Sequence, residues 1–320
     1  MQAQEIITVE NLYKHYGQVK AVDGISLQIS ASEIFGMVGP NGSGKTTTIE
    51  CIEGLRQPDK GKVRVLGLDP EKDFYALREI IGVQLQACNL PARMRVEEAL
   101  DLFASFYQHS VDWRALLDDL GLTEKRRSFY NQLSGGQKQR LFVALALINR
   151  PNIVFLDELT TGLDPQARRA TWDLVRRIRE QGTTVFLTTH FMEEAERLCD
   201  RVAILDHGRV IAMDTPNSLV SQLGMSRRVT FEINGHSSGA TKIANHAASD
   251  FNPALLGVVE GVQKVDQDGN EVVVHGKGNG LVGELVRALE NAGVSFTNLR
   301  SEQANLEDVF LALTGRAIRN

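Results

Sequence analysis

The octapeptide at residues 39–46 restricts the possible folds of this chain more than any other segment. It reads Gly-Pro-Asn-Gly-Ser-Gly-Lys-Thr, follows the apolar run Ile34–Val38 and leads into a helical stretch at Lys45–Gly54. Glycines at this spacing allow backbone N–H groups to turn inward around a phosphate, and the start of the helix adds the positive end of its dipole. Strand, loop and helix in this order therefore predict a nucleotide phosphate site.

The side chains of this loop have separate expected roles. Lys45 is expected to reach the β- and γ-phosphates, and the hydroxyl of Thr46 is expected to bind Mg²⁺. A glycine-rich turn with a coincidental lysine is the structural alternative, which the flanking strand and helix disfavour. The candidate nucleotide-binding residues are Gly39, Pro40, Asn41, Gly42, Ser43, Gly44, Lys45, Thr46 and Thr47.

Two adjacent acids end a second apolar run. Ile153–Leu156 is followed by Asp157 and Glu158, and carboxylates at the tip of a buried strand are costly unless they bind a cation or move protons. Solvated acids also end many strands, so this pattern alone leaves both interpretations open. Together with the phosphate loop, it predicts that Asp157 holds Mg²⁺ and that Glu158 orients and polarises a water molecule that attacks the nucleotide.

Strands and helices alternate around these motifs, which indicates a parallel sheet between layers of helices. Residues from about 92 to 149 are expected to be mostly helical and interrupt that order. The composition shifts near Leu223, and the rest of the chain has strand runs, two amphipathic helices and no catalytic cluster. We therefore expect an α/β domain at residues 1–225 and a small α+β domain at residues 226–320. The expected strands include Val19–Val22, Ile25–Ile29 and Val258–Val265.

Composition and charge disfavour several other classes of protein. Hydrophobic residues make up 42% of the chain and charged residues 23%, a balance typical of a globular protein. The net charge of −5 argues against a nucleic-acid-binding surface. Three cysteines without metal-ligand spacing predict a reducing compartment and no zinc site. The longest apolar run, Leu141–Ile148, is too short to span a membrane, and no signal-peptide pattern is visible. An intracellular chain is expected.

A third motif points to a family. Residues 133–137 read Leu-Ser-Gly-Gly-Gln and lead into a helical stretch. Ser134 can cap that helix, and the glycines allow phosphate to approach the backbone, although these residues alone also fit an ordinary capped helix. With the other two motifs, residues 4–225 resemble the ATP-binding subunit of an ATP-binding cassette (ABC) transporter, and most of all the subunits of ABC-2-type exporters. Residues 305–315 resemble the C-terminal tail of that subgroup.

The resemblance implies further site residues. Tyr16 matches the aromatic residue that stacks on adenine, and His190 matches the histidine that contacts the γ-phosphate. Gln86 matches the glutamine that touches Mg²⁺ and senses the membrane subunit, with Gln84, two residues earlier, as the alternative. Asp164 ends the segment that matches the loop crossing the dimer interface. The residues matching the signature that caps the γ-phosphate of ATP on the opposite protomer are Ser134, Gly135, Gly136 and Gln137.

The resemblance also implies a fold and a function. The fold is a P-loop NTPase cassette, with a RecA-like three-layer core, an antiparallel β part and an inserted helical subdomain. The function is ATP hydrolysis by a head-to-tail homodimer that binds two Mg-ATP and drives a separately encoded integral membrane permease from the cytoplasmic face of the cell membrane. The C-terminal domain is expected to serve dimerisation or regulation. Leu159 stands where the family has proline, which predicts a looser segment and, at worst, slower or less coupled turnover.

Two other functions remain as alternatives. The first is a soluble ABC ATPase acting on ribosomes or DNA, which the single cassette, the acidic charge and the lack of a long coiled-coil insertion disfavour. The second is a nucleotide-gated regulatory module that hydrolyses little ATP, which the complete set of Asp157, Glu158 and His190 disfavours. A phosphate-release assay tests the second alternative, and a stable membrane partner would rule out the first.

Overall fold

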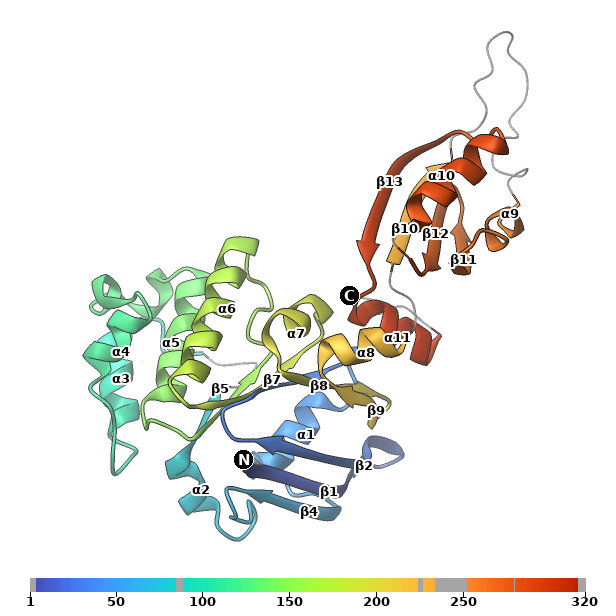
Figure 1. Ribbon diagram of the computed structural model, residues 1–320. Coiled ribbons are helices and arrows are strands. Elements are labelled where there is room, and N and C mark those ends of the chain that lie inside the picture. Colours follow the sequence, from blue (N-terminus) through green and yellow to red (C-terminus); the bar gives the residue numbers. More distant parts are fainter. Residues whose placement is uncertain (1–3, 85–88, 224–226, 234–251, 279, 316–320) are drawn as a thin grey trace. The chain divides into compact units, whose positions relative to one another are not determined.

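The computed structural model describes residues 4–84, 89–223, 227–233, 252–278 and 280–315. The described chain divides into two compact units, one ending at Pro216 and one comprising Asn217–Gly315 (Figure 1). The division falls at the start of α8 (Pro216–Gln222), nearer the N-terminus than residue 225.

A six-stranded sheet forms the centre of the first unit. Its strands, in spatial order, are β5 (Ile81–Gln84), β6 (Ile153–Asp157), β7 (Thr184–Thr189), β3 (Ile34–Val38), β8 (Arg201–Asp206) and β9 (Arg209–Asp214). All neighbours pair in parallel except β8 and β9, which form an antiparallel hairpin. Every residue of β3, β6 and β7 is buried, as expected for parallel strands covered on both faces. This burial explains why the three strands appear in the sequence as short continuous apolar runs.

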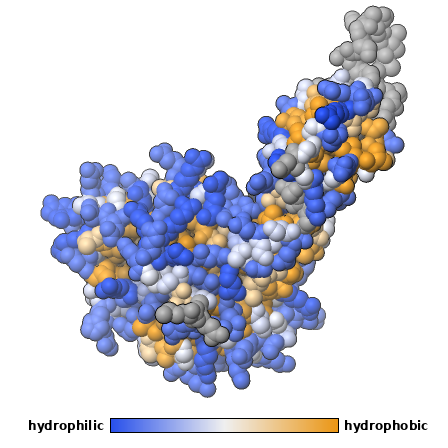
Figure 2. Space-filling model, viewed as in Figure 1, coloured by the Kyte–Doolittle hydropathy of each residue, from blue (hydrophilic) through white to orange (hydrophobic). Residues whose placement is uncertain are grey.

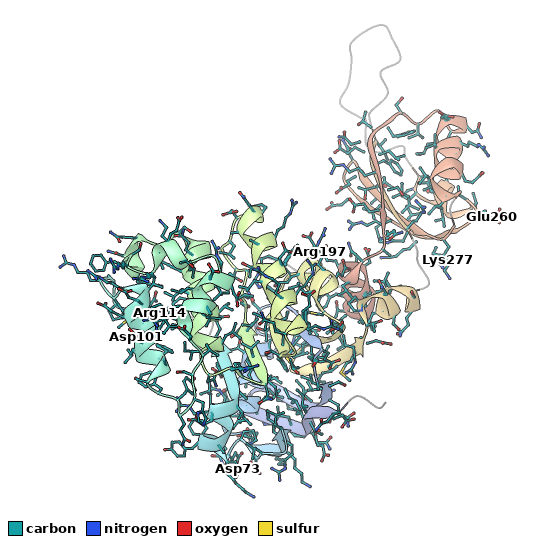
Figure 3. All side chains as sticks on the ribbon, turned by 60° about the vertical axis from the view of Figure 1, so that its left-hand side comes forward. Asp73, Asp101, Arg114, Arg197, Glu260 and Lys277 are labelled. Carbon is teal, nitrogen blue, oxygen red and sulfur yellow. The ribbon has the colours of Figure 1, made fainter. Side chains whose placement is uncertain are left out.

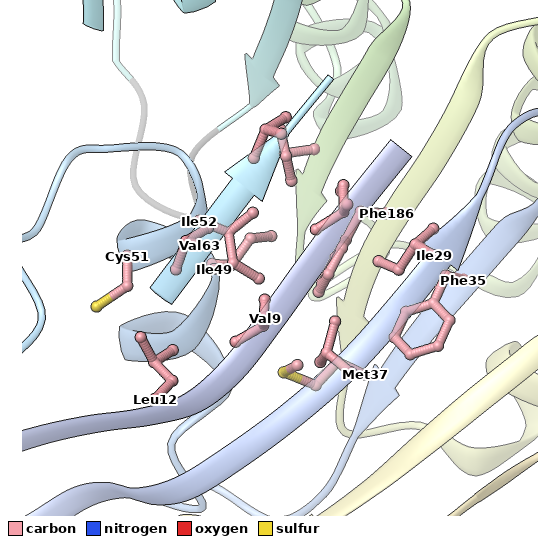
Figure 4. Packing of buried hydrophobic residues seen from close by; sticks show 14 of the residues in the cluster. Val9, Leu12, Ile29, Phe35, Met37, Ile49, Cys51, Ile52, Val63 and Phe186 are labelled. Atoms are coloured by element: carbon pink, nitrogen blue, oxygen red, sulfur yellow. The ribbon is translucent and has the colours of Figure 1, made fainter. Parts of the chain in front are cut away.

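Two further layers cover this sheet (Figure 1). The helices α5 (Gly135–Leu147), α6 (Pro165–Glu180) and α7 (Met192–Leu198) lie on one face. The other face carries α1 (Lys45–Ile52) and an antiparallel sheet of β2 (Val19–Ser30), β1 (Glu5–Tyr16) and β4 (Lys60–Val65). Buried apolar side chains of both sheets and of α1 pack together in one cluster (Figure 4). The result is the expected α/β core with an antiparallel β part.

The region between β5 and β6 is mostly helical. Its elements are α3 (Val96–Ala104), α4 (Trp113–Asp119), two short 3-10 turns (Thr123–Lys125 and Tyr130–Gln132) and α5. The indole of Trp113 on α4 donates a 2.6 Å hydrogen bond to Asp101 on α3, which links the two helices. The remaining helix, α2 (Phe74–Ile80), precedes β5.

Hydrophilic residues cover most of the visible face of the first unit (Figure 2). Within the described ranges, no helix combines the length and apolar composition needed to cross a membrane.

The second unit is a small α+β structure. Its antiparallel sheet has the order β11 (Val262–Asp268), β12 (Glu271–Gly276), β10 (Arg227–Ile233) and β13 (Phe296–Gln303). Besides most of α8, the described residues of this unit form the helices α9 (Ala254–Gly257), α10 (Leu281–Asn291) and α11 (Leu306–Thr314). Apolar residues of β10 and β12, including Val229 and Val274, pack against Leu285 of α10, and all three are fully buried. This unit therefore has a hydrophobic core of its own.

Several expected elements have different bounds in the structure. The two strands expected at Val19–Val22 and Ile25–Ile29 are one continuous strand, β2, whose pairing with β1 shifts register at several points. The strand expected at Val258–Val265 was wrong at its start, because α9 occupies residues 254–257 and β11 begins at Val262. Val258 is 86% exposed, so its hydrophobicity does not mark a buried strand.

Candidate active site

The candidate active site lies where three neighbouring strands end. The spatial order places β7 between β6 and β3, with Asp157 opposite Thr188 and Val38 opposite Thr189. Because the carboxyl ends of parallel strands share one edge of the sheet, the segments that follow them meet there. The phosphate loop, the acid pair and His190 are therefore brought to one edge, although they are far apart in the sequence.

Close backbone contacts fix the shape of the phosphate loop. A Cβ atom at Gly44, where φ is 104°, would lie 2.2 Å from the carbonyl oxygen of Ala21, and one at Gly39 would lie 2.3 Å from that of Leu205. Both contacts are too short for any side chain, so glycine is required at these two positions by packing as well as by the expected approach of phosphate.

Lys45 is enclosed by the loop that it follows. Its side chain is 4% exposed, and Nζ donates hydrogen bonds to the carbonyl oxygens of Gly39 at 2.8 Å and Pro40 at 3.1 Å. Burial lowers the pKa of Lys45, while the nearby carboxylates of Glu158 and Asp157 act in the opposite direction. The ammonium group is thus held within the loop, where a phosphate group would enter.

Asp157 contacts a second predicted metal ligand. One carboxylate oxygen, Oδ1, accepts a hydrogen bond from the hydroxyl of Thr188, and the other, Oδ2, lies 3.5 Å from Oγ1 of Thr46. Burial raises the pKa of Asp157, and the neighbouring carboxylate of Glu158 raises it further. Two hard oxygen donors next to the phosphate loop are the ligand type that Mg²⁺ prefers, so the residues present fit that ion.

Glu158 and His190 face each other at the ends of β6 and β7. Oε1 of Glu158 lies 3.4 Å from Nδ1 of His190, and that nitrogen has no hydrogen-bond partner among the residues that the structure describes. The Glu158 backbone adopts a left-handed conformation, with φ at 49°, and its N–H donates to the carbonyl oxygen of Thr188 at 3.1 Å. Non-glycine residues in this conformation are uncommon and concentrate at functional sites.

A cavity of about 830 Å³ extends from the phosphate loop to Glu158, whereas Asp157, the other acid of the pair, is not among the residues that line it. Its walls include Tyr16, the loop residues Asn41 and Gly42, Lys45 and Glu158. A volume of this size is ample for a nucleotide. The aromatic residue expected to stack on adenine, the lysine expected to bind phosphate and the expected catalytic glutamate thus share one cavity.

Other predicted site residues do not line this cavity. Among the described residues that form its walls, none belongs to the segment Leu133–Gln137, and neither Asp164 nor His190 is included. Ser134 instead caps α5, where it forms a reciprocal capping box with Gln137. Asp164 caps α6 by accepting hydrogen bonds from two backbone N–H groups at 2.9 Å. These segments are ordered within the chain but lie apart from its nucleotide cavity.

Two glutamines were candidates for the residue expected to sense the membrane subunit. Gln86 lies outside the described residues. Gln84, the alternative, ends β5 and is 4% exposed. Leu159, which stands in the place of the family's proline, is 3% exposed, so its side chain lies in the protein interior.

Sequence reasoning missed one part of the cavity wall. Lys20 and Asp23 of β2 and His207 in the β8–β9 turn also line it. The next residue in that turn, Gly208, donates a 2.9 Å hydrogen bond to the carbonyl oxygen of Ser43 and accepts one of 2.8 Å from the N–H of Asp23. The sequence indicated a turn at residues 207–208, but the contact with the phosphate loop depends on β8 lying beside β3.

The geometry agrees with comparisons to known proteins. The sequence pattern of the ABC transporter family matches residues 22–161. A Nod factor export ATP-binding protein I from Ralstonia nicotianae is 36% identical, over 98% of this chain and 95% of that protein. A daunorubicin resistance ATP-binding protein from Streptomyces coeruleorubidus is also 36% identical, over 98% of this chain and 97% of that protein. The chain belongs to the ABC transporter ATP-binding family.

Solved structures of ABC cassettes share the fold. The ATP-binding subunit of an ABC transporter superposes with a TM-score of 0.62 at 28% identity, covering 68% of this chain and 93% of that one. A dimeric bacterial ABC transporter cassette gives a TM-score of 0.58 at 29% identity, covering 66% of this chain and 98% of that one. As a member of the family, this ABC protein binds ATP and is an ATPase.

Proposed function

We propose that this ABC protein is the ATP-hydrolysing, energy-coupling subunit of a membrane exporter. The observation that carries the proposal is the cavity that Tyr16, the phosphate loop and Glu158 line together. It contains the groups needed to bind the base and the phosphates of ATP and to activate a water molecule. The same cavity lacks the signature residues, which are therefore available to a second protomer.

The chain's own residues perform most of the binding steps. Tyr16 stacks on the base, and the backbone N–H groups of the loop together with Lys45 hold the β- and γ-phosphates. Thr46 and Asp157 would hold Mg²⁺, which would neutralise charge on the phosphates. Glu158 orients the attacking water and accepts its proton, and His190 contacts the γ-phosphate beside it.

The second half of the site is proposed to come from another copy of the chain. Ser134 caps the N-terminus of α5, and Gly135 and Gly136 are the first two residues of the helix. A helix start of this kind can bind an anion such as a γ-phosphate. A head-to-tail dimer would bring the signature of one protomer to the cavity of the other, with two ATP molecules between them. The solved dimeric cassette that shares the fold supports this arrangement.

The role in export rests on the relatives. Proteins named for Nod factor export and for daunorubicin resistance align with nearly the whole chain. We propose a separately encoded integral membrane permease as partner, with this subunit bound at the cytoplasmic face of the cell membrane through the helical subdomain and the segment that carries Gln86. The transported molecule would be selected by the permease.

Affinity purification tests the role in export. The tagged chain is purified from gently solubilised native membranes, and its partners are identified by mass spectrometry. Recovery of one polytopic membrane protein is the expected result. Recovery of ribosomes or DNA-repair factors without a membrane protein would overturn the proposal in favour of a soluble ABC ATPase. Phosphate release by the purified chain tests the ATPase cycle separately.

We further propose that residues 226–320 stabilise or regulate the dimer. Support comes from the separate core of the second unit and from apolar side chains that its described residues expose, among them Leu255 at 39% and Val258 at 86%. Replacing Val258 with glutamate in the full chain is expected to weaken ATP-dependent dimerisation in analytical ultracentrifugation. An unchanged dimerisation constant for this variant would contradict a contact at this surface.

A further inference from the structure

Two cations contact the ring of Tyr16 from outside the nucleotide cavity. The guanidinium of Arg56 lies 5.4 Å from the ring centroid, and Nζ of Lys14 lies 5.9 Å from it. Tyr16 lines the cavity, whereas neither Arg56 nor Lys14 does. Arg56 lines a different hollow with Gly54 and neighbouring residues. The ring is 43% exposed, so without these contacts little would fix its orientation.

Each cation is itself held by an acid. The Nε of Arg56 donates a 2.6 Å hydrogen bond to Glu50, a residue of α1. This contact raises the pKa of Arg56, so the guanidinium stays charged. Lys14 forms a 2.9 Å ion pair with Asp59. Arg56 is thus supported by the same helix that begins at the phosphate loop.

Asp59 also fixes the strand that carries the ring. Its second carboxylate oxygen accepts a 2.6 Å hydrogen bond from the backbone N–H of His15, and its own N–H donates to the carbonyl oxygen of Tyr13 at 2.8 Å. The segment after α1 is therefore hydrogen-bonded to the backbone of β1 at Tyr13 and at His15, just before Tyr16. The remaining freedom at Tyr16 is in the side chain, and there Arg56 is the nearer cation.

We infer that Arg56 is a positioning residue for the nucleotide base, because it holds the Tyr16 ring in the orientation that stacks on adenine. A cation is attracted to the face of an aromatic ring, and a ring fixed before binding loses less freedom when the base stacks on it. The inference rests on the proposed binding of ATP in this cavity and adds a residue to it. Arg56 acts through Tyr16, and Glu50 keeps it in place.

If Arg56 has this role, its loss weakens recognition of the base of ATP and leaves recognition of the triphosphate unchanged. Loss of Arg56 weakens the binding of nucleotides that carry a base and leaves the binding of a bare triphosphate chain unchanged. It raises the KM for ATP and leaves kcat unchanged, because the groups around the γ-phosphate are untouched. The expected loss is about two- to fivefold, the range of a cation–π contact at a partly exposed site.

The test compares ATP with inorganic tripolyphosphate. Arg56→Ala is titrated with each ligand by calorimetry in the presence of Mg²⁺, and Arg114→Ala is the matched control. Arg114 stacks on the ring of Trp113 at 4.3 Å in the helical subdomain (Figure 3). We expect weaker ATP binding and unchanged tripolyphosphate binding for Arg56→Ala, and no change for Arg114→Ala. Unchanged ATP affinity, or equal losses for both ligands, would overturn the inference.

A second variant separates the inference from the proposed function. Tyr16→Ala is expected to weaken ATP binding, and adding Arg56→Ala to it is expected to cause no further loss. If Tyr16→Ala leaves ATP affinity unchanged, the proposed base site is wrong. If Tyr16→Ala weakens ATP binding but Arg56→Ala alone does not, or if the two losses simply add, then Arg56 does not act through the ring and only the inference is overturned.

Discussion

The carboxylate of Glu158 lies 3.4 Å from Nδ1 of His190, although the two residues follow different strands. Their side chains are 7% and 14% exposed, so both are shielded from bulk water by the protein. A carboxylate in such a position is well placed to act on a water molecule next to the phosphate loop. Hydrolysis is therefore expected beside Glu158, the member of this pair that lines the cavity.

Replacing Glu158 with glutamine is expected to stop hydrolysis and to preserve ATP binding. The change removes the group that accepts a proton from water, and the phosphate loop stays intact. The rate of phosphate release should fall about 10²- to 10⁴-fold. Size-exclusion chromatography with Mg-ATP should show a trapped dimer. The exposed Glu180→Gln is the control, and a strictly monomeric Glu158→Gln protein would contradict the proposed closed state.

Replacing Lys45 with alanine is expected to weaken nucleotide binding itself. The buried ammonium group is the charged donor within the loop, and losing a charged hydrogen bond to phosphate should lower ATP affinity about 10- to 100-fold. Tripolyphosphate binding should fall by a similar factor, in contrast to the change at Arg56. Calorimetric titration measures both ligands, with the exposed Lys60→Ala as the control. Wild-type affinity in the Lys45 variant would show that this side chain does not bind phosphate.

Replacing Thr188 with valine is expected to leave one oxygen of Asp157 without its hydroxyl donor. Thr188 is completely buried, so valine fits the volume but removes the hydrogen bond, at a cost of about 1–3 kcal/mol in the free energy of unfolding. The Mg²⁺ concentration for half-maximal ATPase activity should also rise, because the carboxylate is less firmly oriented. Denaturant unfolding and a Mg²⁺ titration measure the two effects. Thr188→Ser keeps the hydroxyl, and it should behave like the wild type in the Mg²⁺ titration.

His275 is expected to make the second unit less stable in mild acid. It is buried on β12 between Asp308 of α11 and Asp266 of β11, with Arg228 on β10 and Lys264 on β11 nearby. Burial lowers the pKa of His275, against the opposing effect of the two aspartates. The unfolded chain therefore binds a proton more readily than the folded unit. The free energy of unfolding of the second unit is therefore at its full value above the ordinary histidine pKa of about 6.5, and it decreases as the pH falls below that value.

Hydrogen exchange measures this effect of pH within the second unit itself. Both tryptophans, Trp113 and Trp172, lie in the first unit, so their fluorescence does not report on the second. Protection factors for β10 and β12, corrected for intrinsic rates, should fall between pH 7.5 and 5.5. The fall should be smaller in His275→Gln, which cannot take up the proton. Equal pH dependence in both proteins would contradict the role of His275.

The motifs were predictable because their signals are local. The phosphate loop and the acid pair each follow a fully buried strand, and such strands are visible as apolar runs. Tyr16 carries no local signal of this kind, and the family resemblance identified it. The two cations that contact its ring, Arg56 and Lys14, were not predicted from the sequence. Arg56 is brought to the ring by the way the segment after α1 folds, and no local sequence pattern indicates this contact.

Two strands, β13 and β4, were not predicted from the sequence, because they lie at the edges of their sheets and are largely polar. β13 is an edge strand, and most of its residues are exposed. Its sequence, Phe-Thr-Asn-Leu-Arg-Ser-Glu-Gln, therefore lacks a continuous buried face that could identify it. β4 is also an edge strand, and its first three residues are exposed. Whether a strand lies at an edge depends on how the whole sheet assembles. The sequence of one segment does not show it.

The capped signature helix, separate from its own chain's cavity, has a consequence for kinetics. An enzyme whose site is completed by a second molecule turns over at a rate that rises with the square of its concentration while it is mostly monomeric. Specific activity of the free chain should therefore increase on concentration and fall on dilution. Two copies held on one permease would meet at a fixed, high effective concentration instead. Attachment to the membrane would then make the turnover of each bound subunit independent of the total concentration of the protein in the cell.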